Sequence, residues 1–104
     1  MRLENKVALI TGASRGIGKA IAIAYAREGA DLALNCSSSV ADTEKVAGEV
    51  KRMGRKAVVV QADVADRKMV EDMVSSTISE LGRIDILVNN AGMAVIAPSV
   101  DLSE

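Results

Sequence analysis

The residues best suited to chemistry lie in one short stretch, Thr11-Gly12-Ala13-Ser14-Arg15-Gly16-Ile17-Gly18. An apolar run precedes it and a helical pattern follows it, and a glycine-rich turn in that context is typical of a phosphate-binding loop. Gly12 allows a sharp turn off the strand, Gly16 lets a pyrophosphate approach the backbone, and Gly18 allows close helix packing. The free N–H groups at the start of the helix favour an anion there. A plain structural turn is the alternative.

The end of the second predicted strand bears on which dinucleotide would bind. An NAD site usually has an Asp or Glu there, about 20 residues past the glycine loop, to bind the ribose 2′-hydroxyl. This chain has Asn35-Cys36-Ser37-Ser38 instead. Without a carboxylate nothing repels a 2′-phosphate, which Arg15 and Ser37 could bind. The sequence therefore favours NADP over NAD. A solvated Arg15 and serines that cap the next helix are the alternatives.

Two further polar clusters follow predicted strands. Asp63-Val64 comes after the third strand, where Asp63 could accept a hydrogen bond from an adenine amino group or could serve as a loop or capping residue. Asn89-Asn90-Ala91-Gly92 comes after the fourth strand. The small Ala91-Gly92 pair would let the backbone approach a ligand closely, whereas a turn bonded to its own backbone is the alternative.

These clusters are positioned by alternating strand-like and helix-like segments, which indicate an α/β fold. We expect strands at Lys6–Ile10, Asp31–Cys36, Lys56–Ala62 and Ile84–Asn89, and helices at Arg15–Arg27, Val40–Met53 and Arg67–Leu81. Right-handed crossovers with a reversal after the third strand predict a doubly wound parallel sheet of order 3-2-1-4 with three crossover helices. The fourth strand would then be an edge, and the stretch after Gly92 is expected to be a loop and the start of a helix.

Helical spacing also predicts which faces are buried. In the first helix the predicted inner face is formed by Ile17, Ala20, Ile21, Ala24 and Tyr25. In the second helix it is formed by Thr43, Val46, Ala47, Val50 and Met53. In the third helix it is formed by Val70, Met73, Val74, Thr77, Ile78 and Leu81.

Composition limits the function classes. The chain has 104 residues, a net charge of -1, one tyrosine as its only aromatic residue, and no histidine. The balanced charge and the lack of aromatic residues argue against nucleic-acid binding, and no apolar run has the length of a membrane span. No metal site is predicted. Cys36 is the single cysteine and is expected to be a small buried residue. We therefore expect a cytoplasmic protein without nucleic-acid or membrane partners.

Together these motifs, in this order and at these separations, resemble the short-chain dehydrogenase/reductase family over the whole chain. The resemblance implies the amino-terminal part of an NAD(P)-binding Rossmann domain, residues 1–104. Within the family, Ser14-Arg15 and the missing acid after the second strand are most similar to 3-oxoacyl-[acyl-carrier-protein] reductases. Sugar, polyol and steroid oxidoreductases share the motifs and stay open as alternatives.

The resemblance also implies roles for the matching residues. The pyrophosphate and adenosine end would be lined by Gly12, Ser14, Arg15, Gly16, Ile17 and Gly18. Ser37 would lie beside the 2′-phosphate, and Asp63 and Val64 would frame the adenine. Asn89, Ala91 and Gly92 would shape the floor under the ribose. The implied partners are the dinucleotide, a small-molecule or acyl-carrier-bound carbonyl substrate in the intact enzyme, and further copies in a homo-oligomer.

The family's chemistry is absent from these 104 residues. Its members use an Asn, a Ser and a Tyr-x-x-x-Lys pair in later elements, where the Tyr transfers the proton. Here the only tyrosine, Tyr25, has Gly29 rather than Lys four residues on. No catalytic residue is assigned, and the chain alone is predicted to be inactive. A non-catalytic nucleotide-binding or oligomerising module is the alternative from a different class.

Overall fold

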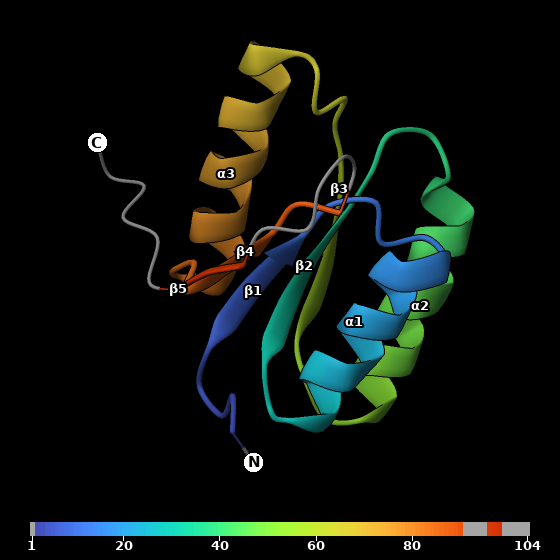
Figure 1. Cartoon of the computed structure of the whole chain (residues 1–104), viewed down its shortest axis with the longest axis vertical. Helices are drawn as coiled ribbons and strands as arrows, with labels where there is room; N and C mark the ends of the chain where they lie inside the picture. Colours follow the sequence, from blue (N-terminus) through green and yellow to red (C-terminus); the bar gives the residue numbers. More distant parts are fainter. Residues whose placement is uncertain (1, 91–95, 99–104) are drawn as a thin grey trace.

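The computed structural model describes residues 2–90 and, for the backbone, 96–98. Figure 1 shows a central sheet with α1 and α2 on one face and α3 on the other. The strands are β1 (Val7–Ile10), β2 (Asp31–Cys36), β3 (Ala57–Gln61), β4 (Ile86–Val88) and β5 (Ile96–Pro98). The helices are α1 (Gly16–Arg27), α2 (Val40–Arg52) and α3 (Arg67–Leu81).

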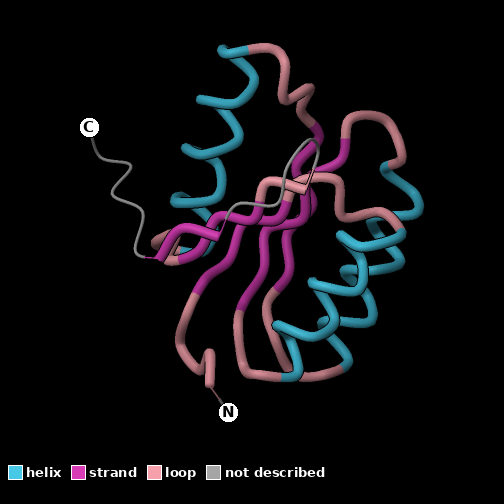
Figure 2. Tube along the Cα trace, viewed as in Figure 1, coloured by secondary structure: helices cyan, strands magenta, loops and turns pink. Residues whose placement is uncertain are grey.

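The first four strands are parallel and stand in the order β3-β2-β1-β4, which confirms the predicted topology. The register pairs Ile10 with Leu34 of β2 and with Val88 of β4. Because all four strands run the same way, the loops that follow them meet at one edge of the sheet, here called the carboxyl edge (Figure 2).

β5 corrects the prediction for the end of the chain. Residues 96–98 form a short strand antiparallel to β4, with Leu87 opposite Ala97, where a loop leading to a helix was expected. β4 is therefore covered by β5 and is not the edge of the sheet. Pro98 has no N–H to donate to a ladder, which suits a strand at the sheet margin.

The core consists of two clusters, one on each face of the sheet. One cluster lies between the sheet and the helices α1 and α2, and it includes the buried Val46 of α2. The strand residues in it are Ala8, Ile10, Leu32 and Leu34. Leu9 and Ala33 alternate to the other face and pack with Met73 of α3. Strands buried on both faces explain the continuous apolar runs in the sequence.

The predicted inner face of α1 is wrong in part: Ile21 and Tyr25 are half-buried and pack against the core, but the other three predicted residues do not. The buried residues are Gly18, Ala22 and Ala26, whereas Ile17 is 69% exposed. Ala20 and Ala24 are also exposed. α1 is apolar over much of its surface, so hydrophobic spacing did not distinguish its faces. Gly18 faces inward because it lies against the glycine loop, and Ala22 and Ala26 belong to the core cluster on this face of the sheet.

The other helices follow the sequence more closely. In α2 the buried residues are Thr43, Val46, Ala47 and Val50, as predicted, but Met53 is the C-cap and is 38% exposed. In α3, Met73 and Thr77 are buried and Ile78 is 36% exposed. Asp66 is the N-cap of α3, and its side chain accepts the Met69 N–H at 3.2 Å.

Within residues 2–90 and 96–98, no helix has the length and apolar character to cross a membrane. The same described part of the chain contains no group of His, Cys, Asp or Glu side chains suited to a metal ion.

Candidate functional site

The glycine loop joins β1 to α1 at the carboxyl edge. Gly12 and Gly16 have φ values of +61° and +62°, in the left-handed region that side chains disfavour. A Cβ built on Gly16 would have no atom within 4 Å, so the backbone there faces open space. Arg15 is the exposed N-cap of α1, and the first turn of this helix has no acidic residue. Backbone N–H groups and positive charge therefore converge where an anion could approach.

Gly18, at the end of the glycine loop, packs against Gly12 near the start of the same loop. A Cβ on Gly18 would collide with the carbonyl oxygen of Gly12 and would lie 2.8 Å from Nδ2 of Asn90. The predicted need for glycine at position 18 is thus explained by contact with the loop backbone as well as by helix packing.

The end of β4 is bonded to the end of β1 through Thr11. The Asn90 N–H donates to Oγ1 of Thr11 at 2.8 Å, and Oγ1 of Thr11 lies 3.3 Å from Oδ1 of Asn89. Nδ2 of Asn90 donates to the Gly12 carbonyl at 3.2 Å. These bonds run to the glycine loop, so the asparagines are more than a self-bonded turn. Thr11 and Asn90 were not among the predicted site residues, although both lie within the motifs that the sequence singled out.

The end of β2 carries no acid. Cys36 is 3% exposed, as expected of a small buried residue, and Ser37 is exposed. The Ser37 carbonyl accepts a bond from Nε2 of Gln61 at 3.1 Å, which holds the turn beside β3. Ser39 occupies the N-cap of α2 without a side-chain capping bond. The Ser37 hydroxyl is therefore placed at the surface beyond β2.

Asp63 and Val64 lie in the loop after β3. Oδ1 of Asp63 accepts the Ala65 N–H at 2.9 Å, the local turn contact that the sequence left open as an alternative. The side chain stays exposed and keeps acceptor capacity for a ligand. Val64 is 39% exposed.

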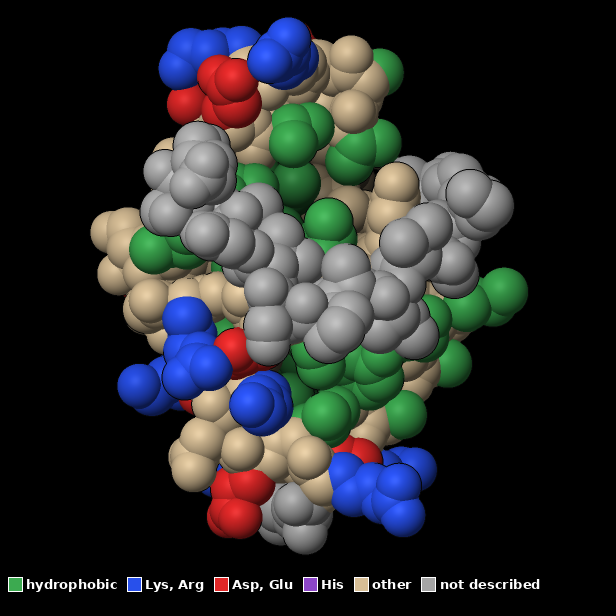
Figure 3. All heavy atoms as spheres, turned by 60° about the vertical axis from the view of Figure 1, so that its left-hand side comes forward, with side chains coloured by type: hydrophobic (Ala, Val, Ile, Leu, Met, Phe, Trp, Pro, Cys, Tyr) green, Lys and Arg blue, Asp and Glu red, His purple; other side chains and the backbone are tan. Residues whose placement is uncertain are grey.

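A cavity of about 150 Å³ lies between α3 and the ends of β1 and β4. Its lining is mostly apolar and comprises Leu9, Thr11, Val64, Val70, Met73, Val74, Leu87 and Asn89. Figure 3 shows hydrophobic side chains at the surface on the side of the molecule that carries α3 and β4. Predicted residues Val64 and Asn89 thus share one hollow, although they follow different strands.

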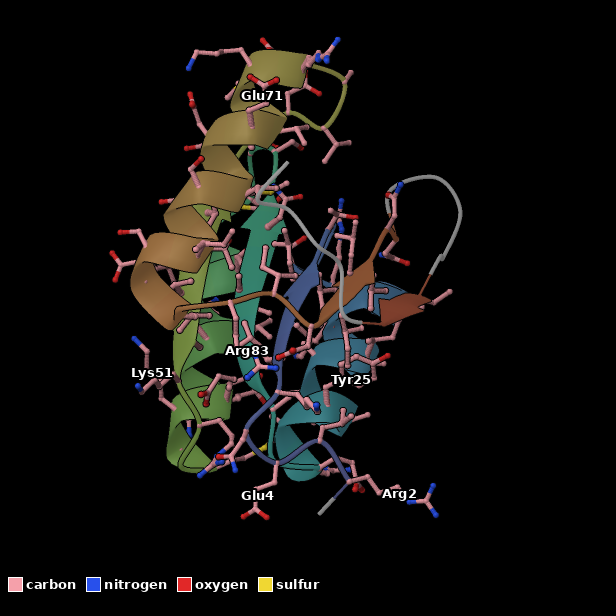
Figure 4. The ribbon with its side chains drawn as sticks, turned by 90° about the vertical axis from the view of Figure 1, so that its left-hand side faces the viewer. Arg2, Glu4, Tyr25, Lys51, Glu71 and Arg83 are labelled. Carbon is pink, nitrogen blue, oxygen red and sulfur yellow. The ribbon has the colours of Figure 1, made fainter. Side chains whose placement is uncertain are left out.

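Tyr25 stands apart from this edge. It is half-buried and packs against the core on the α1 side of the sheet. Figure 4 shows Tyr25 in the lower half of the molecule and Glu71 at its upper end. Ala91 and Gly92, two of the predicted site residues, lie outside the residues that the structure describes.

A buried amide, Asn35, also joins this edge and was not predicted as a site residue. It is 2% exposed, and its side chain bonds both the glycine loop and the end of β3. The sequence feature that could have indicated this role is a polar residue within an otherwise apolar strand.

Known proteins are similar to this chain over nearly its whole length. The family model for the short chain dehydrogenase matches residues 6–104. A 3-oxoacyl-[acyl-carrier-protein] reductase of Staphylococcus epidermidis is 45% identical over 89 residues, which is 86% of this chain and 36% of that protein.

Two solved structures are similar in fold as well. A short chain dehydrogenase from Burkholderia cenocepacia in complex with NADP has a TM-score of 0.85 and 44% identity, over 89% of this chain and 38% of that one. A carveol dehydrogenase from Mycobacterium avium in complex with NAD has a TM-score of 0.81 and 37% identity, over 88% of this chain and 37% of that one. The chain thus spans well under half the length of these proteins.

The sheet order, the glycine loop at the carboxyl edge and the family match over nearly the whole chain agree with one another. The chain therefore belongs to the short-chain dehydrogenase family of NAD(P)-dependent oxidoreductases.

Proposed function

We propose that this chain is the cofactor-binding part of an NADP-dependent oxidoreductase that transfers hydride between NADPH and a carbonyl or alcohol. The observation that carries this proposal is the open backbone at Gly16. It lies beside exposed Arg15, at a helix N-terminus without acidic residues. The pyrophosphate would bind the N–H groups there, with Ser14, Ile17 and Gly18 completing the loop.

The preference for NADP is part of the proposal. It is supported by the absence of a carboxylate at Asn35, Cys36 and Ser37, and by the placement of Ser37 at the surface. Arg15 would pair with the 2′-phosphate in a charge-assisted bond, and Ser37 would donate its hydroxyl. Of the two solved relatives, the Burkholderia protein holds NADP and the Mycobacterium protein holds NAD, so relatives differ in this respect.

The remaining predicted contacts lie farther along the dinucleotide. Asp63 would accept from the adenine amino group while Val64 packs against the ring. Asn89, Ala91 and Gly92 would form the floor under the ribose. The positions of Val64 and Asn89 in one cavity support this arrangement.

We further propose a 3-oxoacyl-acyl-carrier-protein as substrate of the whole protein, on the similarity to the Staphylococcus reductase. The name of the Mycobacterium relative, a carveol dehydrogenase, shows that substrates differ within the family. Because Tyr25 has no lysine four residues on, the 104-residue chain should bind cofactor without reducing a ketone. A cytoplasmic location and a homo-oligomeric state stay predictions of the sequence.

Isothermal titration of the 104-residue chain with NADPH and NADH tests the cofactor proposal. NADPH should bind tighter than NADH. Arg15→Ala should weaken NADPH binding by at least about tenfold and leave NADH binding nearly unchanged, since one charge-assisted bond is lost.

Arg67→Ala is the matched control for this titration. Arg67 also begins a helix, α3, and its side chain is 93% exposed. Its loss removes the same charge without touching the glycine loop, so both affinities should stay at their original values. Tighter binding of NADH than of NADPH, or equal effects of the two arginine substitutions, would contradict the proposed role of Arg15.

A further inference from the structure

Asn35 is a polar side chain in the middle of an apolar environment. It is the fifth residue of β2, with Leu34 and Cys36 as buried neighbours, and only 2% of it is exposed. A buried amide is costly unless its donors and acceptor are bonded. Among the described residues no buried side-chain nitrogen or oxygen lacks a partner, and Asn35 meets this requirement through two other segments of the chain.

The amide nitrogen of Asn35 bonds the end of β3. Nδ2 donates to the Val60 carbonyl at 3.2 Å and to the Ala62 carbonyl at 3.1 Å. Ala62 directly precedes Asp63, so these bonds fix the backbone from which the Asp63-Val64 loop departs. The Ala62 N–H also donates to the Cys36 carbonyl at 2.9 Å.

The oxygens of Asn35 bond the glycine loop on the other side. Oδ1 accepts the Gly12 N–H at 3.4 Å, and the backbone carbonyl accepts the Ala13 N–H at 2.9 Å. Asn35 is therefore hydrogen-bonded to the loop after β1 and to the end of β3 at the same time.

We infer that Asn35 is a positioning residue that holds the glycine loop and the Asp63-Val64 loop at a fixed separation. The inference rests on the proposed function, in which one dinucleotide contacts both loops. A cofactor that binds two loops gains affinity when their spacing is already set before binding. Because Asn35 is buried, it acts through these loops and does not touch the ligand.

This role predicts a distinctive effect on affinity. Arg15 would discriminate between the two dinucleotides, because only NADPH carries the 2′-phosphate. The spacing of the loops matters equally to both. Loss of the Asn35 bonds should therefore raise the Kd of NADPH and of NADH by the same factor.

Two substitutions distinguish the bonds of Asn35 to the glycine loop from its bonds to the end of β3. Asn35→Leu keeps much of the volume and removes all side-chain bonds. Asn35→Asp keeps an acceptor for the Gly12 N–H but has no N–H group for Val60 and Ala62. Thr77→Val is the control, since it removes another buried bond, from Oγ1 of Thr77 to the Met73 carbonyl at 2.9 Å within α3.

The three variants and the original chain are compared by thermal unfolding, by titration well below the unfolding temperature, and by heteronuclear NMR of the backbone amides without cofactor. Asn35→Leu should raise both Kd values by about tenfold, with their ratio unchanged. It should shift the amide resonances of both Gly12 and Asp63. Asn35→Asp should shift Asp63 more than Gly12. Thr77→Val should lower the unfolding temperature without changing either Kd.

The outcomes distinguish this inference from the proposed function. If the original chain binds neither dinucleotide, the proposed function fails, and the amide shifts alone decide whether Asn35 links the loops. If Asn35→Leu is less stable but binds as the original chain does, Asn35 is only structural and the inference is overturned. A changed ratio of the two Kd values in Asn35→Leu would also overturn it, because it would indicate a direct effect at the 2′-phosphate. If Asn35→Leu does not fold, the unequal shifts in Asn35→Asp decide.

Discussion

At the amino ends of β1 and β4, the carboxylate of Asp85 accepts the Val7 N–H at 2.9 Å and the Nε–H of Arg83 at 2.9 Å. At the carboxyl ends of the same two strands, the links are neutral. There the hydroxyl of Thr11 lies 3.3 Å from the amide oxygen of Asn89, and the amide of Asn90 donates to Gly12 at 3.2 Å. The same pair of strands is thus joined by different chemistry at its two ends.

The next strand pair repeats this difference. At the amino end, Oδ1 of Asp31 accepts the Lys56 N–H at 2.9 Å. At the carboxyl end, the neutral amide of Asn35 bonds Ala62 at 3.1 Å. Figure 4 shows Arg83 toward the end of the molecule that carries Arg2 and Glu4, and Glu71 at the other end.

The two edges of the sheet, the carboxyl edge and the amino edge at the opposite ends of the strands, therefore use different side chains to join neighbouring strands. Carboxylates form strong bonds to backbone N–H groups and stabilise the sheet at its amino edge. Amides and hydroxyls form the equivalent links at the carboxyl edge without adding negative charge. A phosphate approaching Gly16 and Arg15 therefore meets no carboxylate from Thr11, Asn35, Asn89 or Asn90.

The largest expected effect is at the carboxyl edge. Gly18→Ala should destabilise the fold by about 3 kcal/mol, because the new Cβ would overlap the Gly12 carbonyl and crowd Asn90. Chemical denaturation followed by circular dichroism measures this loss. Gly48→Ala is the control, since its Cβ would meet only the Arg52 guanidinium, at 3.7 Å, within α2.

Gly48→Ala should stabilise the fold by about 1 kcal/mol, as expected for alanine replacing glycine inside a helix. The two glycine substitutions thus have opposite signs. An unfolding midpoint for Gly18→Ala equal to that of the original chain would mean that the loop is not tightly closed in solution.

The next effect is at the amino edge. Burial of Asp85 opposes its ionisation, but the bonds from Arg83 and Val7 and the nearby charges of Arg83 and Lys6 outweigh it, so its pKa lies below the ordinary 3.8. Asp85→Asn should cost about 2 kcal/mol at neutral pH, the order expected for lost bonds to a buried charge.

The pH dependence of Asp85→Asn has a definite sign. A carboxyl whose pKa is lowered by folding contributes its full stabilisation above its unfolded pKa, and this contribution is lost as the pH falls through the folded value. The gap between Asp85→Asn and the original chain should therefore close at acid pH. Glu80→Gln, an exposed position on α3, is the control. A gap that stays constant from neutral to strongly acid pH would contradict the role assigned to the Asp85 charge.

The sequence was sufficient for the topology because the relevant signals are local. Each strand is a short apolar run, each helix ends at a glycine or a cap, and right-handed crossovers leave few arrangements. Gly82, for example, ends α3 with a φ of +89° at the predicted position. The fold class and the site edge follow from these local signals.

Other features depend on contacts between distant residues and were not predictable. Gly18, Ala22 and Ala26 were missed on the buried face of α1. Gly18 packs against the glycine loop, whose position the helix pattern does not encode, and the two alanines are buried against the sheet. β5 was missed because its pairing with β4, rather than its own three residues, defines it. The partners of Asn35, at Gly12 and Ala62, lie more than twenty residues away in either direction.

The smallest expected effect sharpens the contrast between charges that are buried and charges that are not. Lys68 and Asp72 form a 2.8 Å pair on the first turns of α3, and both side chains are exposed. The hydrogen bond to Asp72 and then its charge raise the pKa of Lys68 above 10.5. Any stabilisation from this pair would be present below the unfolded pKa and lost as the pH rises through the folded value.

Asp72→Asn should nevertheless leave the unfolding midpoint unchanged within error at neutral pH, because water screens an exposed pair. Adding salt to about 0.5 M should abolish any residual difference, whereas the loss in Asp85→Asn should persist, since buried bonds are screened much less. Parallel denaturation of the two variants at low and high salt makes this comparison. If both variants lost stability equally and both recovered in salt, the amino edge would owe its strength to surface charge and not to the buried carboxylate that joins β1 to β4.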